Sequence, residues 1–145
     1  MPVESPEHFN IAAHFLDAPA ASHPERLAII GEPRQVTYGQ MAALTNRVGN
    51  ALRAQGVSRG DRVLIVLPDS AEFIAAFFGA AKIGAVAVPV NPFARATDYI
   101  HYIENCKPHS AIVHSETLQE FLPASSATRR PGCNSIRIAS SRLAS

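Results

Sequence analysis

The chain has 145 residues, the length of one ordinary domain, and its apolar share of 47% against a charged share of 17% excludes an intrinsically disordered protein. Its net charge of +1 conceals an uneven distribution, because all 12 acidic residues and nine of the basic ones fall in residues 4–120 and give that stretch a net charge of −3. A nucleic-acid-binding domain carries a basic face, so we expect no nucleic-acid partner. Two cysteines are too few for a disulfide framework, and the N-terminal residues lack a secretory signal, so we expect a cytoplasmic protein.

One stretch, from Ala71 to Val90, is nearly all apolar and long enough to span a bilayer. Lys82 lies near its middle, where a charge costs about 2.5–3.5 kcal/mol. Gly84 and Pro89 also interrupt the stretch. We therefore predict a buried helix followed by a buried strand, and no membrane partner.

The first third of the chain predicts a short helix, a hairpin and a long helix. The apolar spacing from Phe9 to Leu16 is typical of a short amphipathic helix. Two short strands are expected at residues 26–30 and 35–38, joined by a turn at Glu32-Pro33. Thr37 and Gln40 then have the spacing of a capping box, which predicts a helix that ends before Gly56.

The middle of the chain predicts a β-α-β unit. Residues 62–67 form a short apolar run typical of a parallel strand buried on both faces. Asp69 and Glu72 form a second capping-box pattern, at the start of a helix expected over residues 70–83. Gly84 ends that helix, and residues 85–90 read as the next strand, with Pro89 placing it at its end or near a sheet edge.

The last third adds a helix at residues 97–106, a strand at 111–114 and a helical segment that Ser115 caps and that ends near Leu122. This alternation predicts an α/β fold with a mostly parallel sheet and flanking helices. Residues 123–145 are rich in Ser, Ala and Arg and carry a charge of +4, so we expect one domain at 1–122 and a disordered basic tail at 123–145. The abrupt change in composition is also typical of out-of-frame translation.

Residue chemistry alone predicts neither a catalytic residue nor a metal site. The sequence contains no glycine-rich phosphate loop, and its six histidines are scattered without metal-ligand spacing. Ser70 lacks a nucleophile-elbow pattern, so we interpret it as part of the first turn of a helix. The spacing of Asp69 and Glu72 is explained by capping rather than by acid–base catalysis.

Two motifs nevertheless resemble the adenylate-forming, AMP-binding acyl-CoA synthetase family. Thr37-Tyr38-Gly39 stands in the pattern Val-Thr-Tyr-Gly-Gln-Met, which resembles the family's early [ST]-Y-x-E-L motif. The stretch from Lys82 to Asn91, followed by Pro92, resembles its K-x-G-A-x-x-x-P-[VL]-[ND] element, with Gly84 and Pro89 in place. Segments at residues 9–17, 45–57 and 97–113 are most similar to benzoate–CoA ligase-like members. The resemblance covers residues 9–122 and implies an incomplete N-terminal domain of such an enzyme.

The resemblance implies a two-step reaction in the complete enzyme. A carboxylic acid, with an aryl acid such as benzoate expected, attacks ATP with the help of Mg²⁺ to give an acyl adenylate, and CoA then displaces AMP. No position of this chain matches the family's catalytic motifs, so we expect the fragment to be inactive and to hold no cofactor by itself. In some aryl ligases an arginine after the Asn-Pro pair contacts a CoA phosphate; here Phe93 follows the pair, and Arg95 is the candidate.

Two further hypotheses remain open at this point. The chain could be one half of a split ligase whose partner is the missing remainder. It could instead be a repurposed binding module that uses its basic tail.

Overall fold

The computed structural model of the protein describes residues 8–31 and 34–128, together with the backbone of residues 134–138. In chain order the first elements are η1 (Ala13–Asp17), α1 (Ala18–Ser22), β1 (Leu27–Ile29), β2 (Val36–Thr37) and α2 (Tyr38–Ala54). They are followed by β3 (Arg62–Val66), α3 (Ala71–Lys82), β4 (Val86–Pro89), α4 (Ala96–Cys106) and β5 (Ser110–His114). The last described elements are η2 (Ser115–Thr117), α5 (Leu118–Ala127) and β6 (Asn134–Ile138).

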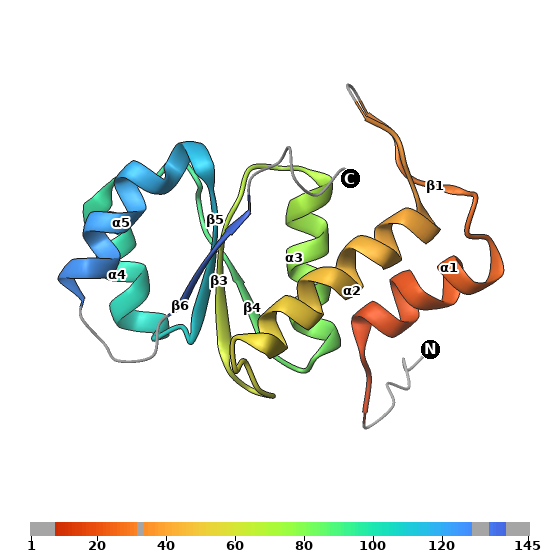
Figure 1. The fold of residues 1–145 in the computed structure, drawn as a ribbon, viewed down its shortest axis with the longest axis horizontal. Helices are drawn as coiled ribbons and strands as arrows, with labels where there is room; N and C mark the ends of the chain where they lie inside the picture. The colour runs from red at the N-terminus through yellow and green to blue at the C-terminus, as the bar shows by residue number, and fades with distance from the viewer. Residues whose placement is uncertain (1–7, 32–33, 129–133, 139–145) are drawn as a thin grey trace, which may run out of the picture.

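The main sheet has the order β4-β3-β5-β6, and its neighbouring strands are all parallel. Helices α2 and α3 cover one face of the sheet, and α4 and α5 cover the other (Figure 1). Strands β1 and β2 form a separate antiparallel pair, while the turn expected at Glu32-Pro33 lies outside the described residues. The predicted α/β fold with a mostly parallel sheet and the predicted β-α-β unit are confirmed.

The core is divided by β3, whose side chains alternate between the two faces of the sheet. Val63 and Ile65 belong to the cluster that α2 and α3 build, whereas Leu64 and Val66 belong to the cluster of α4 and α5. These four side chains are fully buried, with 0% exposure. A strand enclosed on both faces reads as a continuous apolar run, because neither set of side chains meets water. The run at residues 62–67 therefore identified the central strand correctly.

Helices α2 and α3 approach each other closely because each places a glycine at the crossing. A Cβ on Gly79 would lie 3.1 Å from Val48 Cγ1 and 3.2 Å from the Gly49 nitrogen and the Thr45 carbonyl oxygen. A Cβ on Gly49 would lie 3.3 Å from the Gly79 carbonyl oxygen. Since most of these neighbours are backbone atoms, a larger side chain forces the helices apart. Gly79 and Gly49 thus allow the close packing of the two helices.

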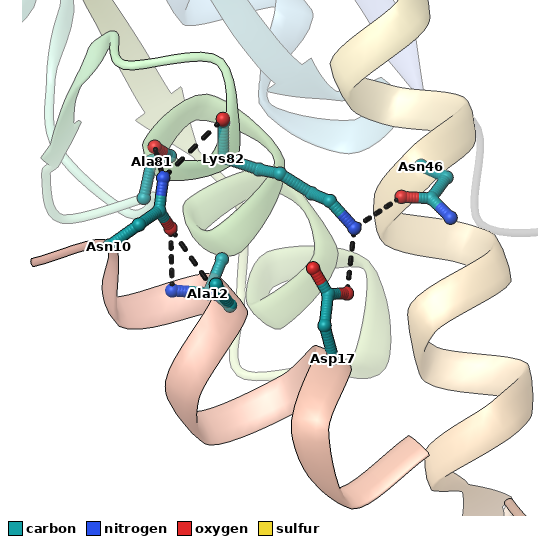
Figure 2. A network of polar contacts seen from close by, with 7 residues as sticks. Asn10, Ala12, Asp17, Asn46, Ala81 and Lys82 are labelled. Atoms are coloured by element: carbon teal, nitrogen blue, oxygen red, sulfur yellow. Dashed lines mark hydrogen bonds and ion pairs between the residues drawn. The ribbon is translucent and has the colours of Figure 1, made fainter. Parts of the chain in front are cut away.

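The N-terminal helical segment is held against α3 by a polar network that centres on Lys82 (Figure 2). The Lys82 ammonium donates to Asp17 Oδ1 at 2.6 Å and to Asn46 Oδ1 at 2.7 Å, so it joins η1 to α2. Asn10 donates through Nδ2 to the Ala81 carbonyl oxygen at 3.2 Å, and its Oδ1 accepts from the Ala12 N–H at 3.0 Å. Asn10 therefore satisfies backbone groups at the start of one helix and the end of another.

The starts of α2 and α3 test the two predicted capping boxes. Thr37 Oγ1 accepts from the Gln40 N–H at 3.3 Å and Gln40 Oε1 accepts from the Thr37 N–H at 3.0 Å, which confirms the first box. The second is wrong, because Ser70 is the N-cap of α3 and its Oγ accepts from the Phe73 N–H at 3.1 Å. Glu72 instead turns toward Arg34, 3.5 Å away. Ser70 lies one position closer to the helix than Asp69, so its side-chain oxygen is the one that reaches the N–H three residues on.

The expected helix end near Leu122 is also wrong, because α5 continues to Ala127. Phe121 and Ala124 are fully buried on either side of Pro123, and their burial carries the helix past the proline. Beyond it, the backbone of β6 pairs with β5 from Ser110↔Asn134 to His114↔Ile138. The proposed division at residue 122, with a disordered tail beyond, stays a prediction. No helix in the described part of the chain is long and apolar enough to cross a membrane.

The glycine crossing predicts that Gly79→Leu destabilises the fold. Leucine favours a helix over glycine by about 1 kcal/mol, but overpacking of a tight contact costs about 1–3 kcal/mol even for small additions. We expect a net loss of at least about 1 kcal/mol in the free energy of unfolding, measured by urea denaturation. The control is Gly31→Ala, where nothing lies within 4 Å, and it should change little. A Gly79→Leu variant as stable as the parent would contradict the close crossing.

The Lys82 network predicts energetic coupling between two residues that lie far apart in sequence. Both side chains of the Lys82–Asp17 pair are about one-third exposed, so we expect a coupling of only about 0.5–1 kcal/mol. A double-mutant cycle with Lys82→Met and Asp17→Asn measures it, and 1 M NaCl should reduce it. In variants that lack the Lys82–Asp17 pair, the backbone amides of residues 11–22 should exchange hydrogen with solvent faster than in the parent. Strictly additive effects at low salt would show that the pair does not hold this helix.

Candidate functional site

The carboxyl ends of the parallel strands β3, β4 and β5 share one edge of the sheet. In open α/β sheets ligands bind outside this edge. The loop at residues 90–95 leaves it after β4 and leads into α4 (Figure 1). We call it the carboxyl-edge loop. It holds three of the predicted site residues, Asn91, Pro92 and Arg95, and is the candidate functional site.

Hydrogen bonds from both sides fix the carboxyl-edge loop. The Val90 N–H donates to the Ile65 carbonyl oxygen at 3.0 Å and so continues the β4 pairing into the loop. Asn91 Oδ1 accepts from the Phe93 N–H at 2.9 Å, which forms a tight turn over Pro92. The Tyr99 hydroxyl donates to the carbonyl oxygens of Pro92 at 2.9 Å and Asn91 at 3.3 Å. The loop backbone is therefore pre-organised before any ligand binds.

Tyr99 is the buried anchor of this loop. Its side chain is fully buried and contacts Phe121 edge-on, with ring centroids 5.5 Å apart. Burial is the main cause that raises the pKa of the Tyr99 hydroxyl above its ordinary value. A backbone hydrogen bond at Ala94 lowers it in part, and the nearby charges of Glu120 and Asp98 raise it further. The hydroxyl stays protonated, and able to donate to the loop, throughout the neutral range.

Arg95 lies on the solvent side of the loop, where α4 begins. Its backbone N–H donates to Asp98 Oδ2 at 3.1 Å, and the next N–H, of Ala96, donates to Glu120 Oε2 at 3.2 Å. Both carboxylates are thus engaged by backbone groups. The Arg95 side chain is exposed, and among the described residues its guanidinium has no hydrogen-bond or ion-pair partner. A guanidinium of this kind fits a phosphate, which it can bind through two parallel hydrogen bonds.

Thr37, Tyr38 and Gly39, which carry the first family motif, join the β1–β2 hairpin to α2. The Tyr38 N–H donates to the Arg26 carbonyl oxygen and the Gly39 N–H to the Pro24 carbonyl oxygen, both at 2.9 Å. A Cβ on Gly39 would lie 3.1 Å from that Pro24 oxygen, so the chain approaches too closely for a side chain. All of these contacts join backbone to backbone within the fold, so the motif has a structural role here.

The second motif spans both ends of β4. Gly84, before the strand, has a φ of 79° and accepts a hydrogen bond from the Gly60 N–H, while a Cβ there would lie 3.0 Å from Arg59 Cγ. Pro89 ends the strand at the sheet edge, as predicted. Lys82 and Gly84 therefore lie at the amino end of β4 and Asn91 at its carboxyl end. An open depression of about 640 Å³ at the amino end is lined by Arg59, residues 8–11 and residues 81–85.

The other polar residues considered from the sequence do not assemble into a reactive group. Asp69 is exposed, Ser70 caps α3, and Glu72 faces Arg34 rather than Asp69. Within the described ranges no group of three His, Cys, Asp or Glu side chains lies close enough to hold a metal ion. His109 contacts Asp61 at 3.4 Å. The absence of catalytic residues stays a prediction for the chain as a whole.

Two features of the carboxyl-edge loop were not predicted. The helix at residues 97–106 was predicted, but nothing in its spacing showed that the Tyr99 hydroxyl reaches back across the loop. Phe93 was noted only as the residue after the Asn-Pro pair, yet it is 81% exposed. An apolar residue after an Asn-Pro pair is only a weak signal of an exposed side chain, because the sequence does not show which loop residues reach the core.

Comparison with known proteins gives a match to the family described as "AMP-binding enzyme" over residues 16–142. The chain is 41% identical over 108 residues to a 3-hydroxybenzoate–CoA ligase of Aromatoleum sp. (strain CIB), covering 74% of this chain and 21% of the relative. It is 35% identical over 126 residues to a 3-hydroxybenzoate–CoA/4-hydroxybenzoate–CoA ligase of Thauera aromatica, covering 86% of this chain and 24% of that one. It thus spans less than a quarter of the length of either curated relative.

Among solved structures, the benzoate CoA ligase from Burkholderia xenovorans LB400 superimposes with a TM-score of 0.82 at 27% identity. The superposition covers 90% of this chain and 26% of that one, so the fold corresponds to a fragment of the larger enzyme. The N-terminal domain of FACL13 from Mycobacterium tuberculosis matches with a TM-score of 0.79 at 32% identity, covering 94% of this chain and 35% of that one. Together with the family match over most of its length, these similarities confirm the resemblance inferred from its motifs: the chain belongs to the AMP-binding enzyme family, as part of an N-terminal domain of the adenylate-forming fold.

Proposed function

We propose that this chain is the front part of an ATP-dependent acid–CoA ligase that activates an aryl acid. The observation that carries the proposal is the similarity to hydroxybenzoate–CoA ligases over 74% and 86% of this chain, together with its coverage of only 21% and 24% of them. In the complete enzyme the acid carboxylate would attack ATP, with Mg²⁺ present, and the CoA thiol would then displace AMP.

The contribution proposed for this chain is support and CoA binding. Arg95 would contact a phosphate of CoA, because its guanidinium is exposed, has no described partner and stands at the ligand-binding edge of the sheet. Pre-organisation of the loop by Tyr99 would lower the cost of ordering that contact. We assign no described residue to the binding of ATP or Mg²⁺. Residues in the remainder of the ligase would bind them.

The proposal places the protein in the cytoplasm, where CoA and ATP are available. Its macromolecular partner would be the remainder of the ligase, either in the same polypeptide or as a separate chain. The second case is the split-ligase hypothesis, and the test below separates it from a fragment that has no activity at all.

We expect the isolated chain to show no acid-dependent ATP–pyrophosphate exchange, because the proposal assigns none of the adenylation chemistry to it. The measurement uses benzoate and 3-hydroxybenzoate as acids, with the intact Thauera aromatica ligase as the positive control. Exchange above a no-protein blank that depends on the acid would contradict the expectation.

The complementary measurement adds the Thauera aromatica ligase from which the segment matching residues 9–122 has been removed. If mixing the two polypeptides restores acid-dependent exchange, this chain can replace the missing N-terminal segment of a ligase. That result would favour the split-ligase hypothesis. Failure to recover exchange, with both pieces shown to be folded by circular dichroism, would argue against this chain as a competent ligase part.

A further inference from the structure

A depression of about 360 Å³ lies where the N-terminal helical segment meets the start of α2. We call it the basic pocket. Three residues of α1 form part of its lining: Ala18, Pro19 and Ser22. The other described lining residues all have side chains that can donate hydrogen bonds: His14 of η1, His23 and Arg26 from the turn before β1, and Tyr38 at the start of α2. No carboxylate is among these lining residues, so the basic pocket gathers donors without an acidic partner.

Backbone hydrogen bonds fix three of the four donor residues relative to one another. The His23 N–H donates to the Pro19 carbonyl oxygen at 2.8 Å, and the Arg26 N–H donates to the His23 carbonyl oxygen at 3.1 Å. The Tyr38 N–H then donates to the Arg26 carbonyl oxygen at 2.9 Å. These residues come from segments on either side of the β1–β2 hairpin, and their spacing is therefore set by the fold before any ligand binds.

The donor side chains of the basic pocket are not used by the described part of the fold. The side chains of His23, Arg26 and Tyr38 make no hydrogen bond or ion pair with the described residues. The His14 ring contacts aromatic rings, with centroids 4.8 and 5.2 Å away, which leave its nitrogen atoms unpaired. The Ser22 hydroxyl, by contrast, donates to a carbonyl oxygen of its own helix at 3.0 Å. Four polar groups thus remain available to a ligand.

The charge of the basic pocket favours an anion. A guanidinium stays protonated at every physiological pH, so Arg26 repels a metal cation. The acidic residues nearest in sequence do not neutralise it. Asp17 is bound to the Lys82 ammonium at 2.6 Å, and Glu25 is not among the lining residues. The positive charge of Arg26 is therefore left for a ligand to match.

The number of donors fits a phosphate group better than a carboxylate. A phosphate has oxygens in four directions, whereas a carboxylate has two oxygens in one plane. A guanidinium can bind two phosphate oxygens through parallel hydrogen bonds, and imidazole and hydroxyl donors can reach the others. A pocket of about 360 Å³ is at the lower end of the range for small-molecule sites, about 300–1,000 Å³, so there is also room for a group attached to the phosphate.

We propose that the basic pocket binds a phosphate group, with Arg26 as its charged ligand and His14, His23 and the Tyr38 hydroxyl as further donors. The Tyr38 backbone serves the fold, while its side chain would serve the ligand. This inference does not rest on the proposed function, because none of these residues is assigned there to the acid, ATP or CoA.

Calorimetric titration of the 145-residue chain with inorganic phosphate tests the proposal, at pH 7 and at an ionic strength held constant with NaCl. Arg26→Gln should weaken phosphate binding about tenfold, because it removes the charge and the paired donors. The matched control is Arg53→Gln, which removes the same charge from an exposed arginine at the other end of α2 and should change the affinity little. Tyr38→Phe, which removes only the hydroxyl, should weaken binding several-fold.

Two further measurements locate the site and identify its ligand. Backbone amide resonances at residues 14, 22–26 and 38 should shift as inorganic phosphate is added, and urea unfolding should show that each variant is folded. Acetate, at the same concentration, should bind more weakly than phosphate. Phenyl phosphate is then compared with inorganic phosphate. Either order supports the phosphate site, since tighter binding of the ester indicates a phosphorylated molecule and tighter binding of the ion indicates free phosphate.

Three results would overturn the inference. Equal losses of affinity in Arg26→Gln and Arg53→Gln would show that phosphate responds only to the overall charge of the chain. Acetate binding as tight as that of phosphate would contradict a site built for four oxygens. Amide shifts confined to residues outside the basic pocket would place the anion elsewhere. None of these results bears on pyrophosphate exchange, so failure here is separable from failure of the proposed ligase function.

Discussion

Burial of β3 on both faces is the constraint on which the rest of the structure depends. Val63 and Ile65 require a cover of helices on one face, and Leu64 and Val66 require a second cover on the other. The strand also pairs in parallel with β4 and β5, so it aligns their carboxyl ends at one edge. A single apolar run of five residues thus sets both the layering of the domain and the place where a ligand can bind.

The conformation of the carboxyl-edge loop depends on the same core. Tyr99 packs beside Phe121 in the cluster that includes Leu64 and Val66, and its hydroxyl donates to the loop carbonyl oxygens of Asn91 and Pro92. Ala94 is buried in that cluster too, whereas Phe93 and Arg95 on either side of it are exposed. The core residues that position the candidate site are therefore different from the residues proposed to bind a ligand.

Much of this fold could be predicted from local signals. The Thr37–Gln40 capping box, the glycine after α2 and the apolar run of β3 each act over a few residues, and the structure has them as expected. The failures have physical reasons. At α3 the predicted cap was Asp69, but the hydroxyl of Ser70, the next residue, makes the bond to the helix N-terminus instead. At α5, burial of Ala124 outweighed the helix-breaking tendency of Pro123.

The contacts that no local pattern could reveal are long-range ones. Asp17 and Lys82 are 65 residues apart, and Asn10 and Ala81 are 71 apart, so only the packing of the N-terminal segment on α3 brings them together. For the candidate site, the motifs indicated the correct loop but not its geometry. The burial of Ala94 depends on packing against α4 and α5, which are formed by residues later in the chain, so the loop sequence alone could not predict it.

The central claim is that two cores on a shared strand make this chain a stable folded unit. Native-state hydrogen exchange of the isolated chain tests it most directly, because buried core amides exchange only when the whole unit opens. We expect the amides of β3 to be the slowest of the chain, with a free energy of opening equal to that of global unfolding in urea. Exchange of the β3 amides at rates close to those of an unfolded peptide would contradict the account.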